Sequence, residues 1–167
     1  MCTSKNKGFS LIEIIVVVVI LGITASIAVL SVSYAYGANS ERCAQKLSAH
    51  LDATRIQSIG MVDGVVYLRI EKTGHGYDAV IVNQTVNVDG TISEVIVSQD
   101  ELCNSSLTIS YVTGSNRYVI DSSYEFQFVK SSGAFYFATD VVKELVIEGS
   151  QTTTLVLVKE TGRNYLK

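Results

Sequence analysis

The residues with the clearest chemical meaning lie near the N-terminus, where one carboxylate stands at the start of a long apolar run. The stretch Lys5-Asn6-Lys7-Gly8-Phe9-Ser10-Leu11-Ile12-Glu13 leads directly into that run. A carboxylate in a membrane-length helix costs about 2.5–3.5 kcal/mol on insertion scales. Because such an acid needs a cationic partner and usually marks a functional site, we predict a functional role for Glu13.

The apolar run covers residues 11–30, which is twenty residues. As a helix it would be about 30 Å long, the thickness of a bilayer core. Lys5 and Lys7 precede it, and the next basic residue is Arg42, so the positive-inside rule predicts a cytoplasmic N-terminus and export of the rest. An ordinary secretory signal fits less well, because the run is long and carries Glu13. A plain single-span anchor is the alternative.

Gly8, Phe9 and Glu13, together with the preceding lysines and the apolar run, resemble the class III signal of type IV pilins and pseudopilins. The resemblance implies that a prepilin peptidase cuts between Gly8 and Phe9 and that Phe9 is then N-methylated. It also implies that Glu13 pairs with the new N-terminal amine of a neighbouring subunit during assembly. In hydrocarbon, such pairing offsets a desolvation cost that an unpaired carboxylate would bear alone.

Two further features of the sequence bear on the subtype of pilin. Many major pilins have proline where this chain has Leu30, which favours a minor pilin or pseudopilin. The C-terminal segments Phe126-Gln127-Phe128, 143–147 and 154–158, followed by Thr161-Gly162-Arg163, resemble the H-type minor pseudopilins. That resemblance implies a helix followed by two antiparallel sheets.

The charge balance is acidic, with 13 Lys and Arg against 16 Asp and Glu. Loss of residues 1–8 would remove two lysines, leaving 11 against 16, or −5. An acidic exported domain argues against non-specific binding to nucleic acid or anionic lipid. Some H-type minor pilins bind DNA through a basic C-terminus, which makes Lys159, Arg163 and Lys167 DNA-binding candidates here. Three phosphate contacts would give only weak, salt-dependent affinity. Nucleic acid is therefore an alternative partner and not the expected one.

Cleavage after residue 8 would also remove Cys2 and leave Cys43 and Cys103. An even pair in an exported domain predicts a disulfide, with two buried free thiols as the alternative. Cys43 shares a helix face with Leu47 and Leu51, and this face should pack on the sheet, where Cys43 could reach Cys103. Spacing does not decide the question, because the two Cα atoms must come within about 7 Å.

The sequence gives no pattern of an enzyme or a metal centre. His50 and His75 are the two histidines, and neither has an obvious serine or cysteine partner. Two scattered histidines and two cysteines do not suggest a zinc site. Gly74-His75-Gly76 lacks the strand-to-helix context of a phosphate loop. We therefore expect no catalytic residue, no metal and no cofactor.

Helical spacing continues beyond the apolar run. An amphipathic stripe is formed by Cys43, Ala44, Leu47, Leu51 and Ile59, and Gly60 is a natural stop, which predicts a helix over residues 9–60. After Gly60, period-two patterning predicts strands near residues 64–71, 77–82, 84–88, 91–97, 106–112, 117–121, 124–130, 134–138, 143–148 and 153–159. Asp89-Gly90 predicts a two-residue hairpin turn.

The predicted fold class is α+β, with a long N-terminal helix packed on an antiparallel β-sheet domain. The first half of the helix would be apolar and transmembrane, and the second half amphipathic and exported. We expect three parts: a leader peptide at 1–8, a transmembrane or filament-core helix at 9–36, and the exported helix half with the β domain at 37–167.

The expected function is that of a structural subunit, a minor pilin or pseudopilin, in a pilus, type II secretion or competence filament. The expected partners are other pilin subunits in a homo- or hetero-oligomeric filament, the prepilin peptidase, the inner-membrane assembly platform and the lipid bilayer. The chain would cross the cytoplasmic membrane once and then enter a periplasmic or extracellular filament. The alternative is a membrane-anchored, β-rich binding protein that never polymerises.

Overall fold

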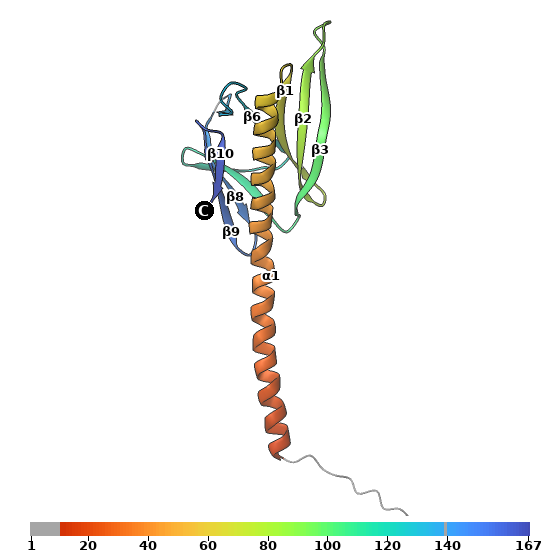
Figure 1. Cartoon of the computed structure of the whole chain (residues 1–167). Coiled ribbons are helices and arrows are strands. Elements are labelled where there is room, and N and C mark those ends of the chain that lie inside the picture. Colours follow the sequence, from red (N-terminus) through yellow and green to blue (C-terminus); the bar gives the residue numbers. More distant parts are fainter. Residues whose placement is uncertain (1–10, 139) are drawn as a thin grey trace, which may run out of the picture. The chain divides into compact units, whose positions relative to one another are not determined.

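The structure, a computed structural model, describes residues 11–138 and 140–167, and over residues 27–38 it describes the backbone alone. The described chain divides into two compact units, the first ending at Ala35 and the second covering Tyr36–Lys167. These residues contain one helix and two antiparallel sheets (Figure 1). The predicted α+β class is therefore confirmed.

Helix α1 covers Leu11–Gly60. It ends at Gly60, as predicted, and the backbone is helical throughout, since the chain contains no proline that would break it. In the second unit the predicted stripe is confirmed at four positions, because Cys43, Ala44, Leu47 and Leu51 are all buried.

The prediction for Ile59 is wrong, because that side chain is 47% exposed. Thr54 and Ser58 occupy the buried face in the last turns instead. Their hydroxyls both have acceptors: Thr54 Oγ1 donates within the helix to the carbonyl of His50 at 2.7 Å, and Ser58 Oγ donates across to the carbonyl of Phe128 at 3.2 Å. Hydrogen bonding therefore lets these two polar residues replace an apolar one in the core.

The first sheet, sheet A, has the strand order β3-β2-β1-β6-β7, with every neighbouring pair antiparallel. Its strands are β1 (Val65–Thr73), β2 (Gly76–Val86), β3 (Ile92–Asn104), β6 (Ser123–Phe128) and β7 (Phe135–Tyr136).

The second sheet, sheet B, has the order β10-β9-β8-β4-β5 and is also antiparallel. Its strands are β4 (Thr108–Thr113), β5 (Asn116–Val119), β8 (Val142–Glu148), β9 (Thr152–Val158) and β10 (Arg163–Leu166). The two antiparallel sheets are those that the C-terminal resemblance implied.

Four differences from the predicted strands involve the sheet edges and turns. The strands predicted at 77–82 and 84–88 form the single strand β2, and β3 extends to Asn104. Strand β10 was not predicted. The Asp89-Gly90 hairpin exists, but its connection is residues 87–91, closed by a hydrogen bond from the Asn87 amide to the Thr91 carbonyl at 2.8 Å.

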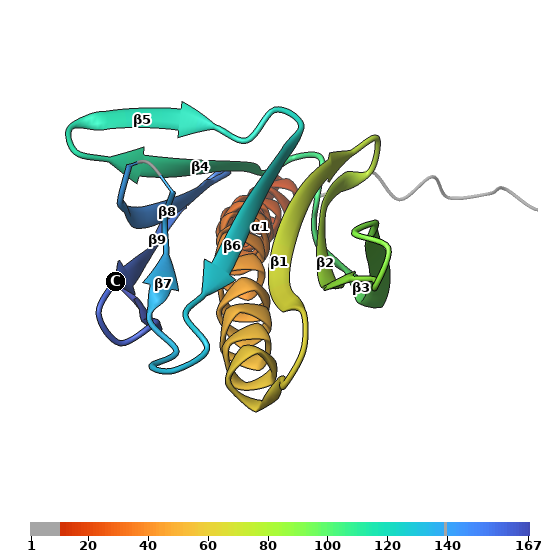
Figure 2. The ribbon, with the colours of Figure 1, turned by 90° about the horizontal axis from the view of Figure 1, so that it is seen from above.

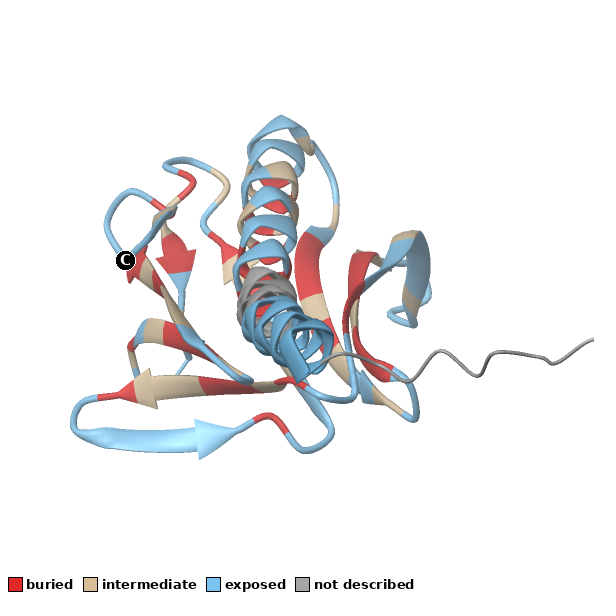
Figure 3. Ribbon diagram, turned by 90° about the horizontal axis from the view of Figure 1, so that it is seen from below, coloured by how far each residue is buried: buried red, intermediate tan, exposed pale blue. Residues whose placement is uncertain are grey.

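The core of the second unit lies where α1 meets both sheets, with sheet A along one side of the helix and sheet B along the other (Figure 2). Leu47 and Leu51 of α1, Leu68 of sheet A and Leu145 of sheet B belong to one buried cluster. Both sheets contain buried segments beside the helix (Figure 3). Apolar burial on two sides of one helix therefore holds the sheets together.

Candidate functional site

Glu13 lies in the first turn of α1 and is exposed, as are its apolar neighbours. Among the large apolar side chains from Leu11 to Ile23, the exposed fraction ranges from 48% at Val16 to 76% at Leu11. None of the ion pairs found among the described residues involves Glu13. The predicted cleavage and methylation residues, Gly8 and Phe9, lie outside the described residues.

The sequence predicted a membrane span over residues 11–30. Within the part of the chain that the structure describes, no helix is both long and apolar enough to cross a membrane.

The structure brings Cys43 and Cys103 together. Cys43 lies on the buried face of α1, and Cys103 lies near the end of β3; they are 1% and 7% exposed. Both are free thiols and belong to one buried core cluster. Hydrogen bonding with the Cys103 thiol, followed by burial, raises the pKa of Cys43, so that its sulfur is held as a protonated thiol.

A pocket of about 320 Å³ opens beside the two thiols. It is lined by Asn39, Arg42, Cys43, Lys46, Glu101, Leu102, Cys103, Asn104 and Leu107. Lys46 closes one side of it, because its Nζ donates to the backbone carbonyl of Glu101 at 2.8 Å. The pocket therefore gives a small thiol reagent a route toward a pair that is otherwise buried.

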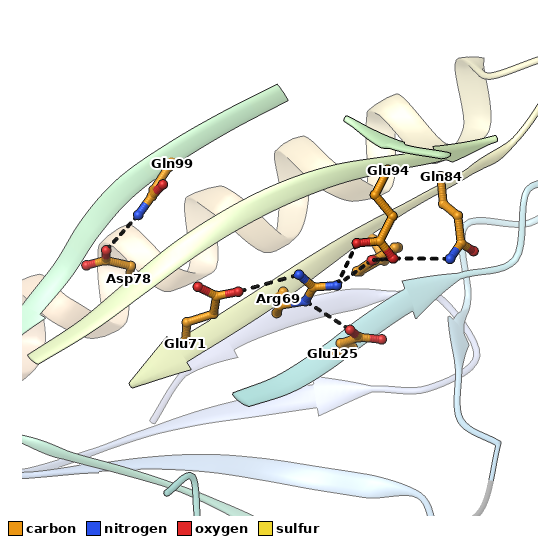
Figure 4. Close-up of polar contacts among 8 residues, drawn as sticks. Arg69, Glu71, Asp78, Gln84, Glu94, Gln99 and Glu125 are labelled. Atoms are coloured by element: carbon orange, nitrogen blue, oxygen red, sulfur yellow. Dashed lines mark hydrogen bonds and ion pairs between the residues drawn. The ribbon is translucent and has the colours of Figure 1, made fainter. Parts of the chain in front are cut away.

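A second polar centre, which the sequence analysis did not identify, surrounds Arg69 on sheet A (Figure 4). The Arg69 guanidinium lies 3.0 Å from Glu125, 3.1 Å from Glu94 and 3.5 Å from Glu71. It also donates to Tyr67 Oη at 2.7 Å, and that hydroxyl donates to Glu94 at 2.8 Å. Period-two spacing of Tyr67, Arg69 and Glu71 places them on one face of β1, but only strand pairing brings Glu94 and Glu125 to them.

The charges in this cluster shift the pKa values of its members. Burial and then the hydrogen bond with Glu94 raise the pKa of Tyr67 to about 12. The hydrogen bond from Tyr67, followed by that from Arg69, lowers the pKa of Glu94. Burial acts to lower the pKa of Arg69, but the bonds to Glu125 and Glu94 outweigh it and raise the value. One cation thus serves three carboxylates, which leaves the cluster with an excess of negative charge.

The three basic residues near the C-terminus lie on one hairpin. Lys159 follows β9, Arg163 begins β10, and Lys167 follows β10; all three are exposed. Thr161 and Gly162 belong to the turn of this hairpin, which ends where Arg163 begins β10, and the Gly162 amide donates to the Val158 carbonyl at 2.9 Å. Its structural part is therefore to connect β9 to the edge strand β10.

The two histidines lie apart in the sequence, and each has a different environment. His50 Nε2 is 3.7 Å from an Asp100 carboxylate oxygen, whereas His75 is exposed in the turn between β1 and β2. Among the described residues, no group of three His, Cys, Asp or Glu side chains could hold a metal ion.

The family model for the prokaryotic N-terminal methylation motif matches residues 3–29. The chain therefore carries a class III signal, consistent with the type IV pilins and pseudopilins, and the resemblance drawn from Gly8, Phe9 and Glu13 is confirmed. No curated protein matches the chain, and no solved structure does.

Proposed function

We propose that this chain is a structural subunit, a minor pilin or pseudopilin, of a type IV filament system. A prepilin peptidase removes residues 1–8, Phe9 is methylated, and the N-terminal helix then joins equivalent helices in a filament. The observation that carries the proposal is the methylation motif at residues 3–29 at the start of a helix whose apolar side chains are exposed.

The exposed apolar surface supports an assembly role. Full burial of a Val, Leu or Ile side chain contributes roughly 1.5–3 kcal/mol, so the side chains from Leu11 to Ile23 favour any environment that covers them. Lipid covers them in the membrane precursor, and neighbouring helices cover them in a filament. Because both states bury the same apolar surface, movement between them costs little in hydrophobic free energy.

Glu13 makes this helix selective for a processed subunit as its partner. A carboxylate among apolar neighbours requires a cation, and the amine created at Phe9 supplies one on an adjacent subunit. The pairing selects a processed partner, because the amine exists only after cleavage. Position 30 is leucine, where many major pilins have proline, and the backbone of α1 is unbroken. Both features support the assignment as a minor pilin or pseudopilin.

We also propose that Cys43 and Cys103 form a disulfide in the exported protein. Both cysteines belong to one buried core cluster and line the same pocket, and a disulfide requires that the two Cα atoms lie within about 7 Å of each other. Exchange with an external disulfide would form the bond: the two thiols lose two protons and two electrons, and the external disulfide becomes two thiols. The bond would fasten α1 to the end of β3.

Processing is tested by N-terminal mass spectrometry of the protein recovered from cells. We expect a chain that begins with methylated Phe9. Gly8→Val should leave uncleaved precursor in the membrane, whereas Gly22→Ala, at a helical glycine with no other atom within 4 Å of the added carbon, should be processed normally. An intact Met1 in the wild-type protein would instead support a membrane-anchored binding protein that does not polymerise.

Assembly is tested with Glu13→Ala, measured as the amount of subunit in sheared filaments. We expect normal cleavage but a large loss of incorporation, because the amine of the neighbouring subunit loses its partner. Glu41→Ala removes an exposed carboxylate elsewhere on α1 and should incorporate normally. Equal incorporation of both variants would remove the role assigned to Glu13.

A further inference from the structure

The edge of sheet A has a free segment with an unusual surface. Strand β3 is one of the two edge strands of sheet A, but its last residues are held against α1: His50 lies 3.7 Å from Asp100, and Lys46 donates to the Glu101 carbonyl at 2.8 Å. The preceding part, residues 92–99, pairs only with β2 within the described residues. Its outer backbone groups are therefore available to another strand.

This free segment is strongly apolar. Ile92 is 64% exposed, Val95 and Ile96 are each 59% exposed, and Val97 is 51% exposed. Proteins usually protect edge strands with lysine, proline or short length, because an exposed apolar edge pairs with other chains. A long edge strand with four exposed β-branched residues therefore indicates a surface that a partner strand covers.

The charge around this segment restricts the partner. Strand β3 contains Glu94, Asp100 and Glu101 and no basic residue. Arg69 reaches Glu94, but Glu71 and Glu125 share the same guanidinium. Pairing of β3 with a second β3 would bring these acids together, and like charges across a strand pair are unfavourable. The expected partner strand is basic with exposed apolar residues.

Strand β10, at the edge of sheet B, has that chemistry. The Asn164 side chain points toward α1, where its amide donates to Asp52 at 3.1 Å and its carbonyl accepts from Ser48. Strand alternation therefore puts Arg163 and Tyr165 on the other face, and Lys167 follows directly after the strand. Tyr165 is 54% exposed and Leu166 is 39% exposed. Within the described residues, neither Arg163 nor Lys167 takes part in an ion pair.

The other edge of sheet B fits less well. Strand β5 has four residues and one basic side chain, Arg117. That guanidinium is already engaged, because it lies 2.7 Å from Glu148 and also donates to Ser110. It is therefore not free to pair with an acidic strand of another molecule.

We propose that residues 92–99 of one copy pair with β10 of a second copy, extending sheet A across the subunit boundary. The exposed Tyr165 would pack against Ile96, with Arg163 and Lys167 facing the acidic residues beside β3. Strands β3 and β10 lie at opposite borders of the second unit (Figures 1 and 2). Each copy then offers one edge to each of two neighbours, and such head-to-tail contacts can continue without closing. The inference rests on the proposed function and requires that copies of this subunit lie next to each other along the filament.

The contact is tested by cysteine cross-linking of the full chain in cells that assemble the filament. A variant with both Ile96→Cys and Tyr165→Cys is treated with a short bis-maleimide. Both positions are more than half exposed, so these changes should not disturb folding. We expect a ladder of dimers, trimers and longer products, because each copy carries both partners of the contact. The wild-type protein should give no ladder, since a reagent that reached Cys43 and Cys103 through their shared pocket would link the two within one chain and not between copies.

Single variants determine which edges meet. Ile96→Cys alone and Tyr165→Cys alone should remain monomers, and their co-expression should stop at dimers. Ile96→Cys paired with Val119→Cys on β5 should give no ladder. A dimer from Ile96→Cys alone would mean that β3 meets β3. A product with a different protein would mean that β3 takes another partner. Either result, or monomers alone from the double variant, would overturn the proposal.

A charge variant tests the electrostatic part. Lys167→Glu in the double-cysteine background should reduce the cross-linked yield about two- to fivefold, whereas Lys143→Glu, at an exposed lysine on β8, should not. Equal yields would contradict the role of charge. Mass spectrometry of the N-terminus in the same samples reports processing separately. A methylated Phe9 without a ladder would reject this contact alone, whereas an intact Met1 would reject the filament function.

Discussion

Cys43 on α1 and Cys103 on β3 belong to one buried core cluster and line the same pocket, although 60 residues separate them in the sequence. The relationship joins the helix to the strand whose first part forms the free edge of sheet A. A covalent bond here would therefore hold the base of β3 against α1 while leaving residues 92–99 open.

Oxidation of this pair should stabilise the fold. A disulfide across a 60-residue loop removes chain entropy from the unfolded state and should add roughly 2–4 kcal/mol to the free energy of unfolding. Thermal melting with and without a reductant measures the difference, and Cys103→Ser, which has no bond to lose, should melt at one temperature in both. Mass labelling of thiols in the denatured exported protein tests formation directly. Two labelled thiols would show that the bond does not form.

Gly162 should be far more sensitive to substitution than Gly114. Both glycines have positive φ, at 64° and 60°, so alanine at Gly114 should cost about 1–2 kcal/mol. At Gly162 the added carbon would also collide with the carbonyl oxygen of Gly133, whereas Gly114 faces open space. We expect Gly162→Ala to lower the free energy of unfolding by about 3 kcal/mol or more. Similar urea midpoints for the two variants would contradict this packing.

Removal of Arg69 should destabilise the domain, because Glu71, Glu94 and Glu125 would then repel one another without a cation. We expect Arg69→Met to reduce the free energy of unfolding by about 1–3 kcal/mol. Lys72→Met is the matched control, since its exposed pair with Asp121 at 3.4 Å should contribute at most about 0.5 kcal/mol. Urea denaturation compares the two. A smaller loss for Arg69→Met than for Lys72→Met would show that the cluster adds nothing.

The same cluster should make stability depend on acid pH. The hydrogen bonds from Tyr67 and Arg69 hold the pKa of Glu94 below its ordinary value of 4.5 in the folded protein. The unfolded chain therefore takes up this proton first, so the contribution of Glu94 is complete above the ordinary value and is lost as pH falls through the lowered one. Urea midpoints measured from neutral to acid pH should fall less steeply for Glu94→Gln than for wild type. Glu101→Gln, on the same strand, should follow the wild-type curve.

Several features were predictable because they depend on local pattern. Helical spacing placed Cys43, Leu47 and Leu51 on one face, and Gly60 marked the end of the helix. The two-residue alternation of apolar and polar side chains predicted most of the strands. The prediction for Ile59 was wrong because a hydrogen bond from Ser58 to the Phe128 carbonyl lets a polar residue occupy the buried face of the helix instead. Strand β10 was missed because its short, polar sequence carries little alternation, and its place depends on pairing with β9.

The sequence by itself determined the signal at Gly8, Phe9 and Glu13, because a peptidase motif and a charge in an apolar run are properties of neighbouring residues. It also determined the α+β class, since hydrophobic period is local. Only the tertiary structure decided that Cys43 lies beside the same pocket as Cys103, that Arg69 gathers acids from three strands, and that β3 and β10 are edge strands of the two sheets. These relationships join residues far apart in the chain, and strand order, which local pattern does not encode, sets which of them become neighbours.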